Sequence, residues 1–159
     1  MPRKKTKDLV RKIEPDRVYD SVLVQRLINK VMQNGKKQLA ERLVYQAMED
    51  AAKQLKEEDP LEILLKALDN VKPVLETRSR RVGGANYQIP YEVKGQRQTH
   101  LTLMWFTRAA RARSGMPTDK RLALEIVDAY NGTGAAVKHK EDVQKMAESN
   151  RAFAHFARQ

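Results

Sequence analysis

The chain of 159 residues lacks cysteine altogether, which excludes disulfide bonds, thiolate metal sites and thiol catalysis. Histidine is scarce as well: His100, His139 and His155 are the only three, and none has the two-histidine spacing of a metal site. No apolar run approaches the roughly 18 residues that a membrane-spanning helix needs. No hydrophobic stretch follows the basic start "MPRKKTKDLVRK", as it would in a signal peptide. We therefore expect no metal, no cofactor and no membrane contact, and a soluble protein of the cytoplasm.

Motifs of catalysis and of nucleotide binding are also missing. The segment "RRVGGA" contains neither GxGxxG nor GxxxxGK[ST], and it leads into a strand rather than a helix. Glu92 and Glu141 are carboxylates without a recognisable partner, and such residues are usually on the surface. We expect a protein that is not an enzyme, with an RNA-processing activity kept as a rival hypothesis.

Positive charge is abundant and unevenly distributed. Lysine and arginine number 31 against 20 acidic residues, which gives a net charge of +11 and a pI near 9.9. The stretch from Glu41 to Glu76 holds nine acids and five cations, whereas the stretch from Lys94 to Arg121 holds seven cations and one acid. The expected partner is therefore a polyanion, bound by one face of the molecule and not by the other.

Apolar residues at helical spacing predict about six helices. These helices are expected to start near Ser21, Leu39, Pro60, Gly95, Thr118 and Val137. The last of them should run without interruption to the end of the chain. The apolar stripes expected to face the core include Leu27, Leu39, Leu65, Met146 and Phe153.

Two segments with period-two alternation flank Gly83 and Gly84, and they predict a β-hairpin over about residues 74–93. An isolated two-stranded ribbon is only marginally stable, so this hairpin must lean on helices or on a partner. The expected fold class is mainly α: a single-domain bundle of about six helices with one protruding β-hairpin. Residues 20–159 would form this helical RNA-binding domain, and residues 1–19 a basic, disordered N-terminal arm.

The hairpin carries three candidate binding residues, Arg78, Arg80 and Arg81. Alternation along a strand sends Arg78 and Arg80 to one face and Arg81 to the other, so the ribbon would be cationic on both sides near its tip. The glycines of the tip allow a close approach of the backbone. This shape suits a nucleic-acid groove, while the plainer alternative is a charged edge strand that prevents aggregation.

The remaining candidates follow from charge and position. Arg108 and Arg111 share a helix face and have no acid three or four residues away in the helix. Lys36 and Lys37 lie in a turn between helices, where amides at a helix start could help to hold a phosphate, although such a turn can also be merely exposed. The other candidate cations lie in the arm, which could instead be a solvated tail, and in the helical segments: Arg3, Lys4, Lys5, Arg97, Arg113 and Arg151.

Three aromatic residues leave two interpretations open. Trp105 lies on an apolar helical stripe, so packing in the core is favoured over stacking on a nucleotide. Tyr87 and Tyr91 alternate on the hairpin and could stack on unpaired bases, but packing of the hairpin onto the bundle is slightly favoured.

Three long blocks resemble bacterial-type small-subunit ribosomal protein seven, in the same order and with similar separations. They are "NGKKQLAERLVYQAM", "LDNVKPVLETRSRRVGGANYQIPYEV" and "AVKHKEDVQKMAESNRAFAHF", and the similarity runs from about residue 20 to the C-terminus. The resemblance implies a helical domain with a protruding hairpin. It also implies a structural protein of the small ribosomal subunit, in the cytoplasm or in an organelle with its own ribosomes.

The function implied by this resemblance is primary binding of 16S-type ribosomal RNA, which nucleates assembly of the subunit head. Further implied partners are exit-site tRNA, mRNA and neighbouring proteins of the head and platform. The positions that match the family's RNA-binding regions are Lys4, Lys5, Lys36, Lys37, Arg78, Arg80, Arg81, Arg108, Arg111, Lys138 and Lys140. The hairpin tip nearest mRNA and exit-site tRNA would be Val82, Gly83, Gly84, Ala85 and Asn86. Charge alone would equally suit a nucleoid-type DNA-binding module.

Overall fold

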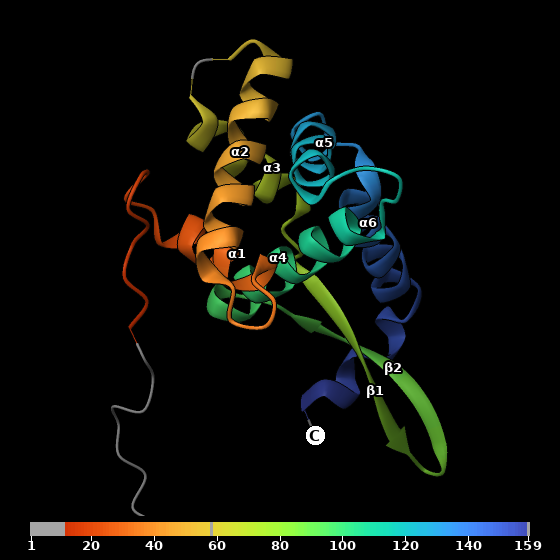
Figure 1. Ribbon diagram of the computed structural model, residues 1–159. Coiled ribbons are helices and arrows are strands. Elements are labelled where there is room, and N and C mark those ends of the chain that lie inside the picture. The colour runs from red at the N-terminus through yellow and green to blue at the C-terminus, as the bar shows by residue number, and fades with distance from the viewer. Residues whose placement is uncertain (1–11, 58, 159) are drawn as a thin grey trace, which may run out of the picture.

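The computed structural model describes residues 12–57 and 59–158, which form a helical body with one long hairpin extending from it (Figure 1). In chain order the elements are α1 (Val22–Val31), α2 (Lys37–Leu55), α3 (Pro60–Val71), β1 (Leu75–Val82), β2 (Ala85–Glu92), α4 (Gly95–Ala112), α5 (Thr118–Tyr130), α6 (Gly134–Ser149) and the 3₁₀ helix η1 (Arg151–Arg158). The prediction of a mainly α fold with six α-helices and one hairpin is confirmed. The predicted division into arm and domain stays a prediction, because residues 1–11 lie outside the described part.

Local signals in the sequence set the helix boundaries. The side chain of Asp59 accepts a hydrogen bond from the amide of Leu61, and Pro60 occupies the first turn of α3, where its missing N–H costs nothing. After α1 the chain turns through Asn34 and Gly35, both at positive φ, before α2 begins. These turns are short, so consecutive helices pack against one another.

The core lies between the helices and is filled by their apolar stripes. Its largest fully buried side chains include Leu27, Ile28, Met48, Ile63, Leu64, Leu103, Phe106 and Ile126. The prediction that Leu39, Leu65 and Met146 face the core is wrong, because they are 47%, 42% and 47% exposed. A stripe read from spacing covers a wide arc of each helix, and the neighbouring helices cover only part of that arc.

The C-terminal segment is broken where an uninterrupted helix was expected. α6 begins at Gly134 and ends at Ser149, and the backbone and side-chain amides of Asn150 both donate to the carbonyl of Met146. The chain then continues as η1, which packs beside the hairpin (Figure 1). The ring of Phe153 in η1 lies 4.9 Å from the ring of Tyr87 in β2, between centroids. The break thus turns the C-terminal segment into a support for the hairpin.

The hairpin has the regular register that its sequence predicts. β1 and β2 are antiparallel, from Leu75 opposite Glu92 to Val82 opposite Ala85. Gly83 and Gly84 form the two-residue turn at φ of +57° and +91°, and tight hairpin turns require such positive φ values. A Cβ atom built on either glycine would meet nothing within 4 Å, so the tip is open on all sides.

A buried carboxylate in α5 joins the end of α4 to the start of α6. Glu125 of α5 is fully buried and accepts hydrogen bonds from Nε and Nη2 of Arg113, at 3.0 and 2.6 Å, and from the amide of Ala136 in α6. Asp128 binds the same guanidinium. Burial alone would lower the pKa of Arg113, but the hydrogen bonds from these two carboxylates raise it above its ordinary value.

Replacement of Arg113 should therefore destabilise the fold. Arg113→Ala leaves the carboxylate of Glu125 buried without its partner, and we expect the free energy of unfolding to fall by about 3 kcal/mol. Urea denaturation measures this loss, with Arg108→Ala on the exposed surface of α4, the helix that ends just before Arg113, as the matched control. An Arg113→Ala protein as stable as the Arg108→Ala protein would contradict the structural role of this ion pair.

Candidate nucleic-acid interface

The base of the hairpin is fixed to α4 by Glu76, a carboxylate of β1 whose side chain is only 8% exposed. Arg97, in the first turn of α4, donates from Nε and Nη2 to Oε2 of Glu76 at 3.0 and 2.9 Å. Arg78 binds the other oxygen, Oε1, and its guanidinium lies 5.3 Å from the ring centroid of Tyr91. Two of the predicted RNA-binding arginines therefore also set the direction of the ribbon, while each keeps about half of its side chain exposed.

The outer part of the hairpin presents its charge to solvent. Arg80 and Arg81 are both exposed, and adjacent positions on a strand put them on opposite faces. Within the described residues, Arg81 has no side-chain hydrogen bond or ion pair. The backbone from Val82 to Asn86 forms the open tip. The ribbon thus carries cations on both faces near its end, as predicted.

One face of α4 packs along α1 and forms a seam between the two helices. Gln96, His100, Leu103, Thr107 and Arg111 follow the helical repeat along this face. The first three line one cleft, and the last two line a second cleft nearer the C-terminal end of α4. We call the two clefts and the face that joins them the α1–α4 seam.

The first cleft of the seam, of about 510 Å³, lies near the base of the hairpin and collects positive charge. Lys12, Arg26 and Lys30 line it together with His100, and none of the residues from 12 to 57 or 59 to 158 that line it is a carboxylate. The Nε atom of Arg26 is buried and has no hydrogen-bond partner among the described residues. A buried donor without a partner is costly, and the cations that line this cleft are suited to an incoming acceptor such as a phosphate oxygen.

The positive charge in and around this cleft affects the pKa of His100. Partial burial and the nearby charges of Lys30 and Arg97 lower the pKa of His100 below its ordinary value of 6.5. Each of these effects disfavours the protonated ring. The free protein therefore carries a positive potential here that a polyanion would relieve.

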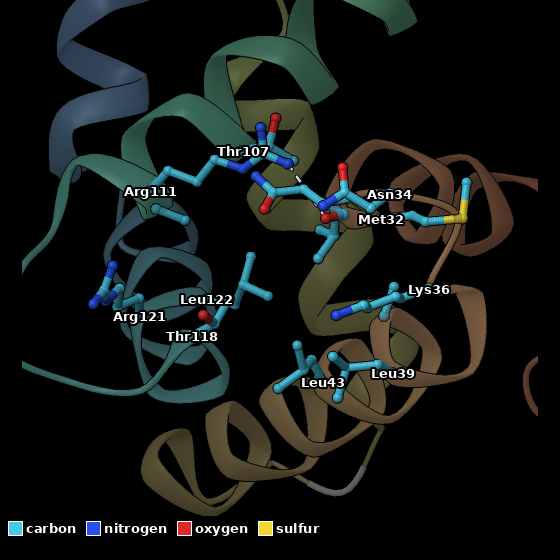
Figure 2. Close-up of a pocket in the computed structure, with 14 residues that line it drawn as sticks. Met32, Asn34, Lys36, Leu39, Leu43, Thr107, Arg111, Thr118, Arg121 and Leu122 are labelled. Carbon is cyan, nitrogen blue, oxygen red and sulfur yellow. Dashed lines mark hydrogen bonds between the residues drawn. The ribbon is translucent and has the colours of Figure 1, made fainter.

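The second cleft of the seam, of about 370 Å³, lies between the α1–α2 turn, α4 and α5 (Figure 2). Its cations are Lys36, Arg111 and Arg121, and no carboxylate from the described part of the chain lines it. Arg111 donates from Nη2 to the carbonyls of Lys30 and Val31, at 3.0 and 3.3 Å, and so caps the C-terminal end of α1. The guanidinium is thereby held at the mouth of the cleft.

The other predicted binding residues differ in how much the chain itself engages them. Arg108, Lys138 and Arg151 are exposed, and their side chains make no hydrogen bond or ion pair within residues 12–57 and 59–158. The Nζ atom of Lys37 lies 3.7 Å from Oε1 of Glu41, and Nζ of Lys140 donates to the backbone carbonyl of Asn70. Arg3, Lys4 and Lys5 lie outside the described residues.

The three aromatic residues are engaged in packing. Trp105 is 6% exposed and meets the ring of His139 edge-on, with the ring centroids 4.8 Å apart. Tyr87 packs on Phe153, and Tyr91 lies beneath the guanidinium of Arg78. The core interpretation of Trp105 is confirmed, Tyr87 fastens the hairpin to η1, and the contact of Tyr91 with Arg78 lies within the hairpin.

Four cations that line the clefts of the seam were not among the predicted binding residues. They are Lys12, Arg26, Lys30 and Arg121. The signal for two of them was present, because Arg26 and Lys30 are four apart on α1 and therefore share a helix face. Only the apolar face of α1 was used in the prediction.

Negative charge gathers at the opposite end of the molecule from the hairpin. The acids Glu49, Glu57, Asp59 and Glu62 lie around the junction of α2 and α3. Figure 1 shows this junction at the far end of the helical body. The predicted polarity of the molecule is therefore present in the structure.

Within the described residues, no helix is long and apolar enough to cross a membrane. In the same part of the chain, no group of three histidine, aspartate or glutamate residues could hold a metal ion.

Comparison with known proteins gives consistent matches. Residues 2–151 match the family described as ribosomal protein S7p/S5e, so the match begins earlier than the predicted similarity and includes most of the arm. Proteins named small ribosomal subunit protein uS7 are similar over 146 residues, which is 92% of this chain. The identities are 54% for Kosmotoga olearia, covering 94% of that protein, and 57% and 58% for Dictyoglomus turgidum and Dictyoglomus thermophilum, each covering 93%.

The electrostatic account of the first cleft can be tested through His100. Removing a neighbouring positive charge favours the protonated ring, so Lys30→Gln should raise the pKa of His100 toward its ordinary value. An NMR titration of the imidazole signals measures the change, with Lys53→Gln at the acidic end as the control that removes the same charge. If both variants leave the pKa of His100 where it is in the unaltered protein, the cleft does not concentrate charge as described.

Proposed function

The chain belongs to the ribosomal protein S7p/S5e family, and we propose that it binds RNA through the hairpin and the α1–α4 seam. The protein is a structural constituent of the small ribosomal subunit, where it binds ribosomal RNA and other ribosomal proteins. The family is one of structural proteins and not of enzymes, and its bacterial members belong to the cytoplasmic ribosome. Family membership thus favours RNA over the DNA that charge alone would equally suit.

The observation that carries the proposed surface is the positive charge of both clefts along one helix. Among the residues that the structure describes, both clefts of the seam are lined by cations and by no carboxylate. The seam begins at the end of α4 where Glu76 fastens the hairpin, and an α4 of 18 residues extends it by about 27 Å. Two cationic structures, a ribbon and a seam, are therefore joined at one rigid point.

The mechanism supported by this arrangement is electrostatic clamping. Cations displace counterions from phosphates and hold separate RNA segments in one mutual geometry. The edges of bases in an A-form major groove are out of reach, so recognition rests mainly on shape, backbone and 2′-hydroxyl groups. Folding of an RNA junction then costs less free energy, because the protein supplies a preformed arrangement of charge.

The finer assignments are part of the proposal. The protein would bind 16S-type RNA first and nucleate assembly of the subunit head, next to proteins of the head and platform. The open tip from Val82 to Asn86, with its two glycines, would approach mRNA and exit-site tRNA. The proposed RNA contacts of the described residues are Lys36, Lys37, Arg78, Arg80, Arg81, Arg97, Arg108, Arg111, Lys138, Lys140 and Arg151, with Arg113 acting mainly through the fold.

The proposal predicts that RNA affinity falls steeply with salt. It also predicts that two arginines of the same strand, Arg78 and Arg81, differ in their contribution to folding stability. If about six phosphates are engaged, the log–log slope of affinity against salt should be on the order of −5. Arg81→Ala should weaken binding of small-subunit ribosomal RNA and make that slope shallower by about 1 without changing the free energy of unfolding. Arg78→Ala should lower both the affinity and the free energy of unfolding, because Glu76 loses a partner.

Filter binding of the RNA at several salt concentrations, together with urea denaturation, measures both effects. Lys53→Ala removes the same charge at the acidic end and should leave the affinity unchanged. A flat salt titration would refute electrostatic clamping, and equal losses from Lys53→Ala and Arg81→Ala would show that only net charge matters.

A further inference from the structure

The second cleft of the seam differs from a simple cationic surface because its floor is apolar. Leu39, Leu43 and Leu122 line it from α2 and α5, and Leu39 is 47% exposed at a position that the sequence predicts to be buried. Figure 2 shows Leu39 and Leu43 below the open space and Leu122 beside it, with Lys36 extending into it from the α1–α2 turn and Arg111 crossing above it toward α1. The cleft therefore combines an uncovered hydrophobic surface with fixed positive charge.

Both clefts also contain uncharged polar residues, but the second offers three leucine side chains, whereas the first has one leucine, Leu103, beside Ile13. A phosphate alone would leave the exposed side chain of Leu39 uncovered, and a purely apolar ligand would leave three cations without a counterion. The volume of about 370 Å³ falls in the range of roughly 300–1,000 Å³ that is typical of pockets for small ligands. The occupant should thus have one flat or apolar part and one anionic part.

From this geometry we infer that the cleft binds a single unstacked nucleotide of the RNA, an inference that rests on the proposed function. The base lies on the floor of Leu39, Leu43 and Leu122, since extruded bases are commonly held between apolar side chains. The phosphate on its backbone binds Lys36 and Arg111. The side-chain amide of Asn34, at the edge of the cleft, can pair with the edge of the base.

The position of Arg111 supports a phosphate at this point. Its guanidinium is held by the carbonyls of Lys30 and Val31, and a guanidinium has five donors, so several N–H groups stay available for an anion. Arg121 is anchored in the same way, because its Nε donates to the carbonyl of Met116 at 2.5 Å. Two pre-oriented arginines lower the entropic cost of holding an anion beside the apolar floor.

The charge of the cleft also decides between RNA and a protein as the occupant. The C-terminal residue of a neighbouring protein would offer a carboxylate and an apolar side chain as well. It would supply one negative charge against three cations, whereas a nucleotide within a strand brings the phosphates on both of its sides. The observations therefore favour the nucleotide, and the protein becomes an outcome of the test.

The absence of cysteine from the chain makes a direct test possible. Leu39→Cys carries a benzophenone label into the cleft, and Leu65→Cys, at a leucine of α3 that is 42% exposed, is the matched control. Each labelled full-length protein is bound to small-subunit ribosomal RNA, alone and in reconstituted small subunits, and irradiated. We expect the label at residue 39 to crosslink to one nucleotide that is not base-paired, and the label at residue 65 to give no such crosslink.

Affinity measurements separate the apolar contact from the charge. Leu39→Ser should weaken binding of the same RNA roughly fivefold, at the low end of what the loss of one stacked base costs, with an unchanged salt slope. Lys36→Gln should weaken binding and make the slope shallower by about 1. Leu65→Ser should change neither quantity.

Three results would overturn the inference. They are a crosslink from residue 39 to a protein, a crosslink to paired nucleotides, and an affinity of the Leu39→Ser protein equal to that of the unaltered chain. Each of them leaves the proposed function intact, provided that the unaltered protein still binds the RNA with a steep salt dependence. Loss of that binding would instead refute the proposed function itself.

Discussion

The buried carboxylate of Glu76 is the contact on which the functional shape depends. A hairpin of two strands has little stability of its own, and this one extends from the body along most of its length. Glu76 binds Arg97 of α4 and Arg78 of its own strand, so one acid fixes the ribbon to the helix that also forms the seam. Tyr87 and η1 support the ribbon from its other side. The direction of the ribbon is therefore set before any RNA is bound.

Charge in this protein has two separate uses. Arg113 and Arg97 are held by acids with little or no exposure, and they join elements that are distant in sequence. Arg81, Arg108 and Lys36 face solvent and are available to phosphates. A net charge of +11 would repel itself in a compact fold, and the buried carboxylates reduce that repulsion where the chain is most crowded. The same residue type thus builds the scaffold at one position and binds RNA at another.

The helices and the hairpin could be predicted from the sequence, but the contacts between these elements could not. Periodicity, Pro60 and the glycines of the hairpin tip are local signals, and they placed six helices and the ribbon correctly. The partnership of Glu76 with Arg97 crosses 21 positions, and no local pattern specifies it. The break at Asn150 was missed for a similar reason, because the 3₁₀ turn after it is favoured by the contact of Phe153 with Tyr87. The clefts of the seam likewise exist only once α1, α4 and α5 have packed together.

The central claim is that the ribbon and the seam hold their mutual geometry in the free protein. Spin labels on the pair Asn86→Cys and Lys120→Cys, in a chain with no other cysteine, report the distance between the hairpin tip and α5. Pulsed electron paramagnetic resonance without RNA should give one narrow distance distribution, and Glu76→Gln should broaden it. A distribution that is broad from the outset, and unchanged by Glu76→Gln, would contradict the account.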